Sequence, residues 1–136
     1  MTEIEKKELL SRAKVIAVVG ISDNPDKPSN IVARYLMQEG YRVIPVNPNY
    51  SEVLGERCYK SLTEIGEHVD IVDIFMRAEK IMPVVEEAIG IRPECIWLQL
   101  GIVNESAKRL AEERGIKFVM DQCLKIEHTR LIKGYR

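Results

Sequence analysis

The sequence predicts an α/β protein with a doubly wound parallel sheet of five strands, flanked by helices. Short runs rich in β-branched residues alternate with segments of helical periodicity, most of them roughly ten to fifteen residues long. This alternation is typical of βαβ units, whose right-handed crossovers give a parallel sheet. We expect the strand order 3-2-1-4-5, with its switch point between strands 1 and 4. No composition shift or linker divides the chain, so residues 1–136 are expected to form one domain.

The predicted strands share continuous runs of apolar residues, typical of strands buried on both faces of a sheet. They cover residues 15–20, 41–48, 69–75, 94–100 and 117–120. Gly20 ends the first strand, and Asn47 with Pro48 ends the second. All these runs are far shorter than the roughly 20 apolar residues of a membrane span.

The predicted helices share apolar residues at intervals of three and four and carry start or stop signals. They cover residues 3–13, the stretch from Pro28 to Gly40, a short turn near 61–66, residues 78–89 and 104–115, and a closing segment from Cys123. Thr2 with Glu5 and Ser61 with Glu64 have the spacing of a capping box. Asn104 is a candidate N-cap.

Composition and charge narrow the function classes. Apolar residues make up 46% and charged residues 30%, and the formal net charge is -1. Without a basic cluster, neither duplex nucleic acid nor an anionic membrane is an expected partner. The three cysteines include no CxxC pair, which argues against a zinc site or a disulfide framework. The charged N-terminal stretch lacks the apolar core of a signal peptide, so a cytoplasmic location is expected.

In a doubly wound sheet, ligands bind beyond the carboxyl ends of the strands, and the loop after the first strand has phosphate-binding features. Gly20 permits a sharp turn and close approach by a phosphate. Ser22 and Asn24 offer side-chain donors, and Lys27 offers a cation. Ser29 is placed to cap the following helix, whose free N–H groups favour an anion. An ordinary βα loop explains the glycine equally well.

A dinucleotide is not the ligand that this pattern favours. Ser22 and Pro25 stand where the second and third fingerprint glycines would be. The second strand ends in PVNPNY, without the acid that holds an NAD ribose. Asn47 and Pro48 would instead flank an adenine or a ribose, or simply form the turn that ends a strand.

Three further strand ends complete the candidate site. Phe75 is apolar, and Arg77 is either a planar partner for phosphate or a solvated residue at a helix start. Gly101 precedes a helix whose N–H groups point at the sheet edge. Cys123 begins the last helix, where the dipole would lower the pKa of its thiol. A buried structural cysteine and a redox partner for a ligand thiol are both open interpretations.

The sequence contains no convincing catalytic constellation. His68 and His128 are expected to be surface or capping residues. Asp70 and Asp73 lie three residues apart in a strand, so they point to opposite faces and form no acid/base pair. Trp97 is expected in the core. An enzyme is therefore not the expected function, and no metal site is predicted.

Five segments together resemble the single-domain CoA-binding proteins, which are similar to the N-terminal CoA-binding domain of the succinyl-CoA synthetase alpha subunit. They read GISDNPDKPSNIVARYL, YRVIPVNP, VDIVDIFMRAE, IWLQLGIVNE and VMDQCLKIEH, and the resemblance covers about residues 12–132. It implies a Rossmann-like fold that binds coenzyme A through these loops. By this resemblance, the phosphates of coenzyme A would contact Gly20, Ser22, Lys27 and the helix start at Ser29, and the adenosine would lie near Asn47 and Pro48. The middle of the ligand would be lined by Phe75 and Arg77. The open sheet edge would be bordered by Gly101 and Cys123.

The resemblance has two departures. The synthetase also needs a second domain with a phosphohistidine and a partner subunit, and neither is present in this sequence, so ligase activity is not implied. The family pattern often has an arginine where this chain has Gln122.

The leading interpretation is a CoA-binding or acyl-CoA-binding protein with a non-catalytic or regulatory role. The alternatives are a nicotinamide-nucleotide-dependent reductase and a protein-interaction module with no nucleotide ligand. A homodimer fits a small domain of this type. The sequence leaves open which acyl group, if any, is bound and whether Cys123 forms a mixed disulfide with coenzyme A.

Overall fold

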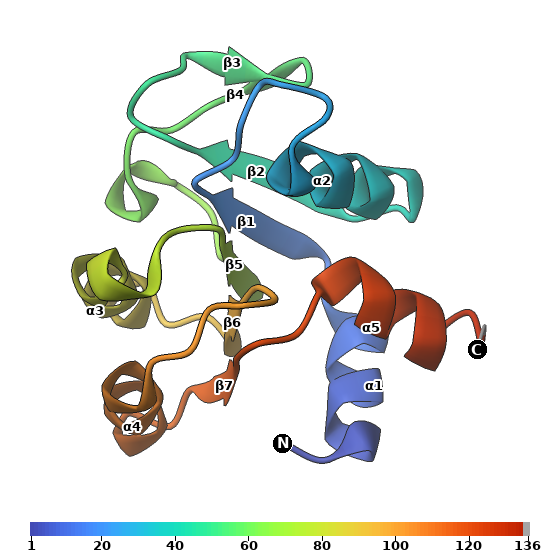
Figure 1. The fold of residues 1–136 in the computed structure, drawn as a ribbon, viewed down its shortest axis with the longest axis vertical. Helices are drawn as coiled ribbons and strands as arrows, with labels where there is room; N and C mark the ends of the chain where they lie inside the picture. The colour runs from blue at the N-terminus through green and yellow to red at the C-terminus, as the bar shows by residue number, and fades with distance from the viewer. Residues whose placement is uncertain (135–136) are drawn as a thin grey trace.

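A parallel sheet lies between two layers of helices (Figure 1). The structure, a computed structural model, describes residues 1–134. The sheet consists of β1 (Val15–Val19), β2 (Arg42–Val46), β5 (Ile71–Ile74), β6 (Cys95–Leu98) and β7 (Lys117–Val119). The helices are α1 (Glu3–Arg12), α2 (Pro28–Gln38), α3 (Met82–Gly90), α4 (Glu105–Glu113) and α5 (Leu124–Leu131). The short elements are a hairpin of β3 (Glu52–Val53) and β4 (Glu56–Arg57) and the 3-10 turns η1 (Leu62–Glu64) and η2 (Ala78–Lys80).

The predicted α/β class and five-stranded parallel sheet are confirmed, but the predicted strand order is wrong. The strands lie in the order β2-β1-β5-β6-β7, and every neighbouring pair is parallel. Counted along the chain this order is 2-1-3-4-5, so the switch point lies between β1 and β5, the third strand.

Pro45 gives the physical reason why the third strand does not pair with β2. The Pro45 carbonyl points to the outer side of β2, where it accepts a hydrogen bond from the Tyr59 N–H at 3.0 Å. The nitrogen of the same residue points to the same side and carries no hydrogen, so that side cannot form a full ladder. β2 is therefore an edge strand, and β5 pairs with the free side of β1.

Two apolar clusters fill the spaces on either side of the sheet. α3 and α4 cover one face, where buried Val85, Ala88 and Ala107 pack against the sheet. α1, α2 and α5 cover the other face (Figure 1). Trp97 lies wholly buried there, as predicted, and its Nε1 donates to the Gln122 carbonyl at 2.8 Å. Of the helices within residues 1–134, none has both the length and the apolar character needed to cross a membrane.

Two of the predicted helix caps formed, at Thr2 and at Asn104. The Thr2 hydroxyl accepts from the Glu5 N–H, and the Glu5 carboxylate accepts from the Thr2 N–H, both at 3.1 Å. Asn104 caps α4 by accepting from an N–H of the first turn at 2.9 Å. The capping box at Ser61 is wrong, because the segment forms only the 3-10 turn η1, whose Leu62 N–H donates to Glu87 of α3.

Candidate functional site

Two adjoining cavities lie at the carboxyl-terminal edge of the sheet, where the switch point places them. The larger, of about 810 Å³, lies among the start of α2, the segments after β5 and β6, and the first turn of α5. Its lining is mostly apolar and includes Ile31, Phe75, Met76, Leu100, Ile102 and Ile126. Its polar lining residues are Arg77, Gln99, Cys123 and Lys125.

The smaller cavity, of about 380 Å³, lies at the ends of β1 and β2. Gly20, Asn47 and Pro48 line it, together with Lys60 from the segment that returns along the edge of β2. Met76 lines both cavities, so they meet beside the end of β5. A third cavity, of about 430 Å³, shares Pro48 and Lys60 with the smaller one.

Gly20 forms the predicted sharp turn, and it also permits a contact that the sequence did not reveal. Its backbone has φ of 81°, in the left-handed region, and its N–H donates to the Val46 carbonyl at 2.9 Å. A Cβ at this position would lie 2.2 Å from the Phe75 carbonyl oxygen. The group that approaches Gly20 closely is therefore the chain after β5.

Ser29 does not cap the helix, so that prediction is wrong. α2 begins at Pro28, and its N-cap residue is Lys27, which makes no side-chain cap. A proline favours the first helical position because its missing N–H is not needed there. This places Ser29 inside the first turn, where its buried Oγ accepts from the Ser22 N–H at 2.9 Å.

The rest of the loop is held by side chains that bond to its own backbone. Ser22 Oγ accepts from the Asn24 N–H at 3.0 Å, and Asn24 Oδ1 accepts from the Asp26 N–H at 2.9 Å. Asn30 Nδ2 donates to the Ser22 carbonyl at 2.9 Å. These bonds fix the backbone of the loop without a ligand.

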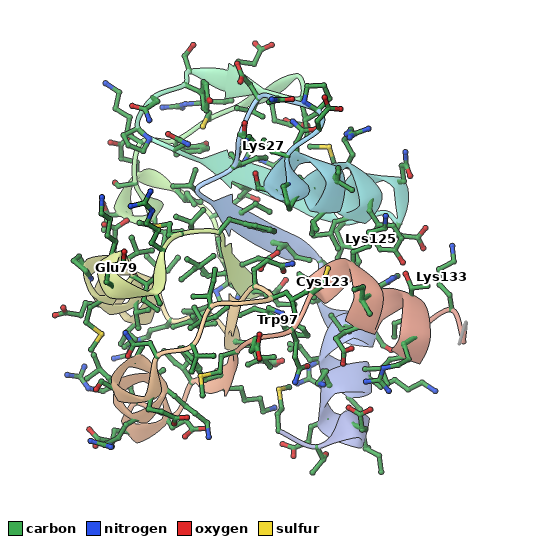
Figure 2. All side chains as sticks on the ribbon, in the orientation of Figure 1. Lys27, Glu79, Trp97, Cys123, Lys125 and Lys133 are labelled. Carbon is green, nitrogen blue, oxygen red and sulfur yellow. The ribbon has the colours of Figure 1, made fainter. Side chains whose placement is uncertain are left out.

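Lys27 is the exposed cation at the end of this loop, at the start of α2 (Figure 2). No salt bridge within residues 1–134 includes it. Its charge is therefore available to an anion at the sheet edge.

Asn47 and Pro48 lie side by side in the smaller cavity. Asn47 Nδ2 donates to the Ile21 carbonyl at 2.8 Å, and its Oδ1 accepts from the Asn49 N–H at 2.9 Å. The Asn47 amide thus ties the end of β2 to the loop after β1.

Of the residues predicted farther along the sheet edge, three line the larger cavity: Phe75, Arg77 and Cys123. Cys123 is half-buried and is the N-cap residue of α5, and Lys125 lies in the first turn of that helix (Figure 2). Gly101 does not line either of the two adjoining cavities, although both of its neighbours line the larger one. Its N–H donates to the Asp121 carboxylate at 2.7 Å.

Several residues of the site were not predicted from the sequence. Met76, Leu100 and Lys125 lie within segments that the resemblance singled out, but only their neighbours were chosen. Lys60 carried no signal, because it comes near β2 only through the bridge between Val46 and Tyr59.

Two titratable residues that line neither of the two adjoining cavities are buried. Asp73 is wholly buried, and neither carboxylate oxygen has a hydrogen-bond partner within residues 1–134. Burial raises its pKa well above the usual range, so the neutral acid is favoured. His128 is also buried, which contradicts the expected surface position, and its Nδ1 lies 2.7 Å from the Tyr35 hydroxyl. Burial lowers the pKa of His128.

Comparison with known proteins shows which family the chain belongs to. Residues 14–129 match the sequence model of a family described as CoA binding domain. The chain belongs to that family. The predicted resemblance to the CoA-binding domain of the succinyl-CoA synthetase type is thereby confirmed. In the part of the chain that the structure describes, no group of three metal-binding side chains is gathered.

The chain matches some relatives over nearly their whole length and others that are much longer than itself. The uncharacterized protein YneT of Bacillus subtilis (strain 168) is 42% identical over 94% of this chain and 95% of its own length. A solved structure from Thermus thermophilus, cell-free ID.343, is 41% identical with a TM-score of 0.93, over 96% of this chain and 99% of its own. The ADP-forming acetate–CoA ligase I of Archaeoglobus fulgidus is 32% identical over 91% of this chain, which spans only 20% of the ligase.

Proposed function

We propose that this domain binds coenzyme A, free or as an acyl thioester, in the two adjoining cavities at the sheet edge. The observation that carries the proposal is the shared wall at Met76, which joins the smaller cavity at β1 and β2 to the larger one at β5 and β6. Coenzyme A has a nucleotide at one end and a pantetheine arm at the other, so an elongated pair of cavities suits it. Membership in the CoA binding domain family supports the same ligand.

In this proposal the nucleotide lies at the ends of β1 and β2, with the adenosine beside Asn47 and Pro48. The phosphates lie by the loop from Gly20 to Lys27 and near Arg77, because unpaired cations and helix N–H groups attract phosphate. Ser22, Asn24 and Ser29 then act by fixing the shape of that loop, since their side chains bond to its backbone.

The pantetheine arm then crosses Phe75 toward Cys123, past the segment that contains Gly101. We propose binding alone, because no catalytic motif is found in the sequence. The cytoplasmic location and the homodimer stay predictions from the sequence.

A thermal-shift titration with coenzyme A, 3′-dephospho-CoA and NAD tests the proposal. A ligand at one hundred times its dissociation constant stabilises the native state by about 2.7 kcal/mol, which shifts the melting temperature by several degrees. We expect coenzyme A to shift the melting temperature and NAD to leave it unchanged. A shift with NAD alone would favour the reductase, and no shift with any ligand at millimolar concentration would favour the interaction module.

A matched pair of variants locates the site. Lys27→Gln removes an unpaired cation at the sheet edge, and Lys7→Gln removes an exposed lysine of α1. We expect calorimetry to show several-fold weaker coenzyme A binding for Lys27→Gln and unchanged binding for Lys7→Gln. Equal affinities for the two variants would place the phosphates elsewhere.

A further inference from the structure

Exposed apolar side chains gather around the larger cavity. Leu100 is 63% exposed and Ile126 is 56% exposed, and both line it. Ile31, at 36% exposure, lines it from α2, and Val103, at 48%, follows the lining residue Ile102 along the chain. Apolar surface gathered in one place is unfavourable in water, so this cavity suits an apolar occupant.

The larger cavity has few polar lining residues, namely Arg77, Gln99, Cys123 and Lys125. Gln99 is nearly buried, and its Oε1 already accepts from the Leu124 N–H at 3.2 Å. Arg77 and Lys125 come from different elements, and neither takes part in a salt bridge within the described residues. Lys125 Nζ lies 5.6 Å from the centroid of the Tyr35 ring. The cavity therefore combines an apolar interior with two cations that have no carboxylate partner among residues 1–134, which suits a ligand that has an anionic part and an apolar tail.

The pantetheine arm alone does not match this chemistry. It contains two amides, and burying an amide without hydrogen-bond partners is energetically unfavourable. An alkyl chain attached through the thioester needs no such partners, and binding becomes more favourable with each methylene removed from water. The volume of about 810 Å³ lies within the range of pockets that enclose drug-sized ligands, so it has room for more than a thiol.

We propose that the larger cavity holds the acyl group of an acyl-CoA, and that this domain prefers linear aliphatic acyl thioesters to free coenzyme A. The inference rests on the proposed function, because the nucleotide must occupy the smaller cavity for the acyl group to reach the larger one. The acyl chain covers the side chains of Leu100 and Ile126, and the thioester lies toward Cys123.

A calorimetric series with coenzyme A and its acetyl, butyryl, hexanoyl and octanoyl thioesters tests the preference. A fully buried methylene contributes about 0.8 kcal/mol, which corresponds to about fourfold in affinity at room temperature. We expect the affinity to rise by up to this factor per methylene, until the chain outgrows the cavity. If coenzyme A binds but its thioesters bind no more tightly, the acyl inference is wrong and the proposed function stands. If neither coenzyme A nor any thioester binds, the proposed function itself is wrong.

Surface variants identify the walls that the acyl group touches. Leu100→Ser and Ile126→Ser make the lining polar, whereas Ile4→Ser changes an apolar residue that is 72% exposed on α1. We expect the ratio of octanoyl-CoA to coenzyme A affinity to fall in the first two variants and to stay at the wild-type value in the third. An unchanged ratio in Leu100→Ser and Ile126→Ser would overturn the placement.

A second copy of the chain is the competing occupant of this apolar surface. Sedimentation velocity of the wild type and of Leu100→Ser, with and without octanoyl-CoA, distinguishes the two. A monomer in all four samples supports the acyl assignment. A wild-type dimer that Leu100→Ser dissociates, together with no gain in affinity from the acyl chain, would assign the surface to an interface between copies.

Discussion

The loop after β1 and the wall of the larger cavity are built in opposite ways. Beside the smaller cavity, polar side chains such as Ser22, Asn24 and Asn47 bond to the backbone of the chain itself. The larger cavity instead exposes apolar side chains, among them Leu100 and Ile126, to solvent. The loop is therefore shaped before any ligand arrives, whereas the apolar wall of the larger cavity is stabilised only when an apolar group covers it.

The largest effect is expected where the two cavities meet. Gly20→Ala places a methyl group 2.2 Å from the Phe75 carbonyl oxygen at a positive φ, so the backbone must move. We expect the free energy of unfolding to fall by about 3 kcal/mol or more, measured by urea denaturation. Gly55→Ala is the control, since Gly55 also has a positive φ but nothing within 4 Å of the added Cβ. It should lose only about 1–2 kcal/mol, and equal losses would show that Gly20 does not form a tight junction.

The second prediction compares two carboxylates on the same strand segment. Asp70 accepts hydrogen bonds from the N–H groups of Lys14 and Val15 at 2.8 and 2.9 Å, whereas Asp73 is buried with no hydrogen-bond partner among the described residues. We expect Asp70→Asn to destabilise the protein and Asp73→Asn to stabilise it at pH 8, each by about 1–3 kcal/mol. Urea denaturation of both variants measures these changes.

The pH dependence gives a separate check on Asp73. Because its pKa is higher in the folded state, the folded protein binds the proton more tightly. That contribution to stability is complete below the unfolded pKa and is lost as the pH rises through the folded pKa. The wild type should therefore lose stability relative to Asp73→Asn as the pH rises above about 4. A constant difference from pH 4 to 8 would mean that Asp73 is ionised throughout.

The third prediction tests whether the polar loop is shaped in advance. Ser29→Ala leaves the Ser22 N–H without its partner, which should destabilise the protein by about 1 kcal/mol. If the loop holds phosphate, coenzyme A binding should weaken several-fold in calorimetry as well. Ser11→Ala, which removes an exposed hydroxyl from α1, should change neither quantity measurably. A loss of stability with unchanged ligand affinity would separate the loop from the binding site.

The smallest effect concerns the cysteine in the wall of the larger cavity. Cys58 and Cys95 are buried, and burial raises the pKa of both thiols, whereas Cys123 is half-buried and lines the cavity. We expect iodoacetamide to modify Cys123 first, as followed by mass spectrometry, since only an accessible thiolate reacts. Saturating coenzyme A should slow this modification. If the rate is the same with and without ligand, the pantetheine arm does not pass Cys123.

The sequence predicted features that depend on local pattern and missed those that depend on the path of the chain. Apolar runs located the five strands, and strand ends located Gly20, Asn47 and Phe75 at one edge. Strand order was wrong because periodicity does not specify neighbours, although Pro45 in the second strand was a usable sign of an edge.

The site was harder to predict because partners of polar side chains are set by tertiary structure. Ser29 has the residue type of a helix cap, yet the proline before it moves the helix start, and its hydroxyl turns to the Ser22 N–H instead. Lys60 lines the smaller cavity because the chain between β2 and β5 returns along the edge of β2, and no local sequence pattern predicts that return. The meeting of the two cavities at Met76 likewise follows from which strand ends become neighbours.

The proline in β2 has a consequence for how this domain meets other molecules. An exposed strand edge with a full row of donors can add a strand from another chain and start aggregation. Here the Pro45 position offers no donor, and its carbonyl already accepts from the Tyr59 N–H. A continuous intermolecular sheet therefore cannot extend across β2, and two copies of this domain must associate through side chains rather than by joining their sheets at that edge.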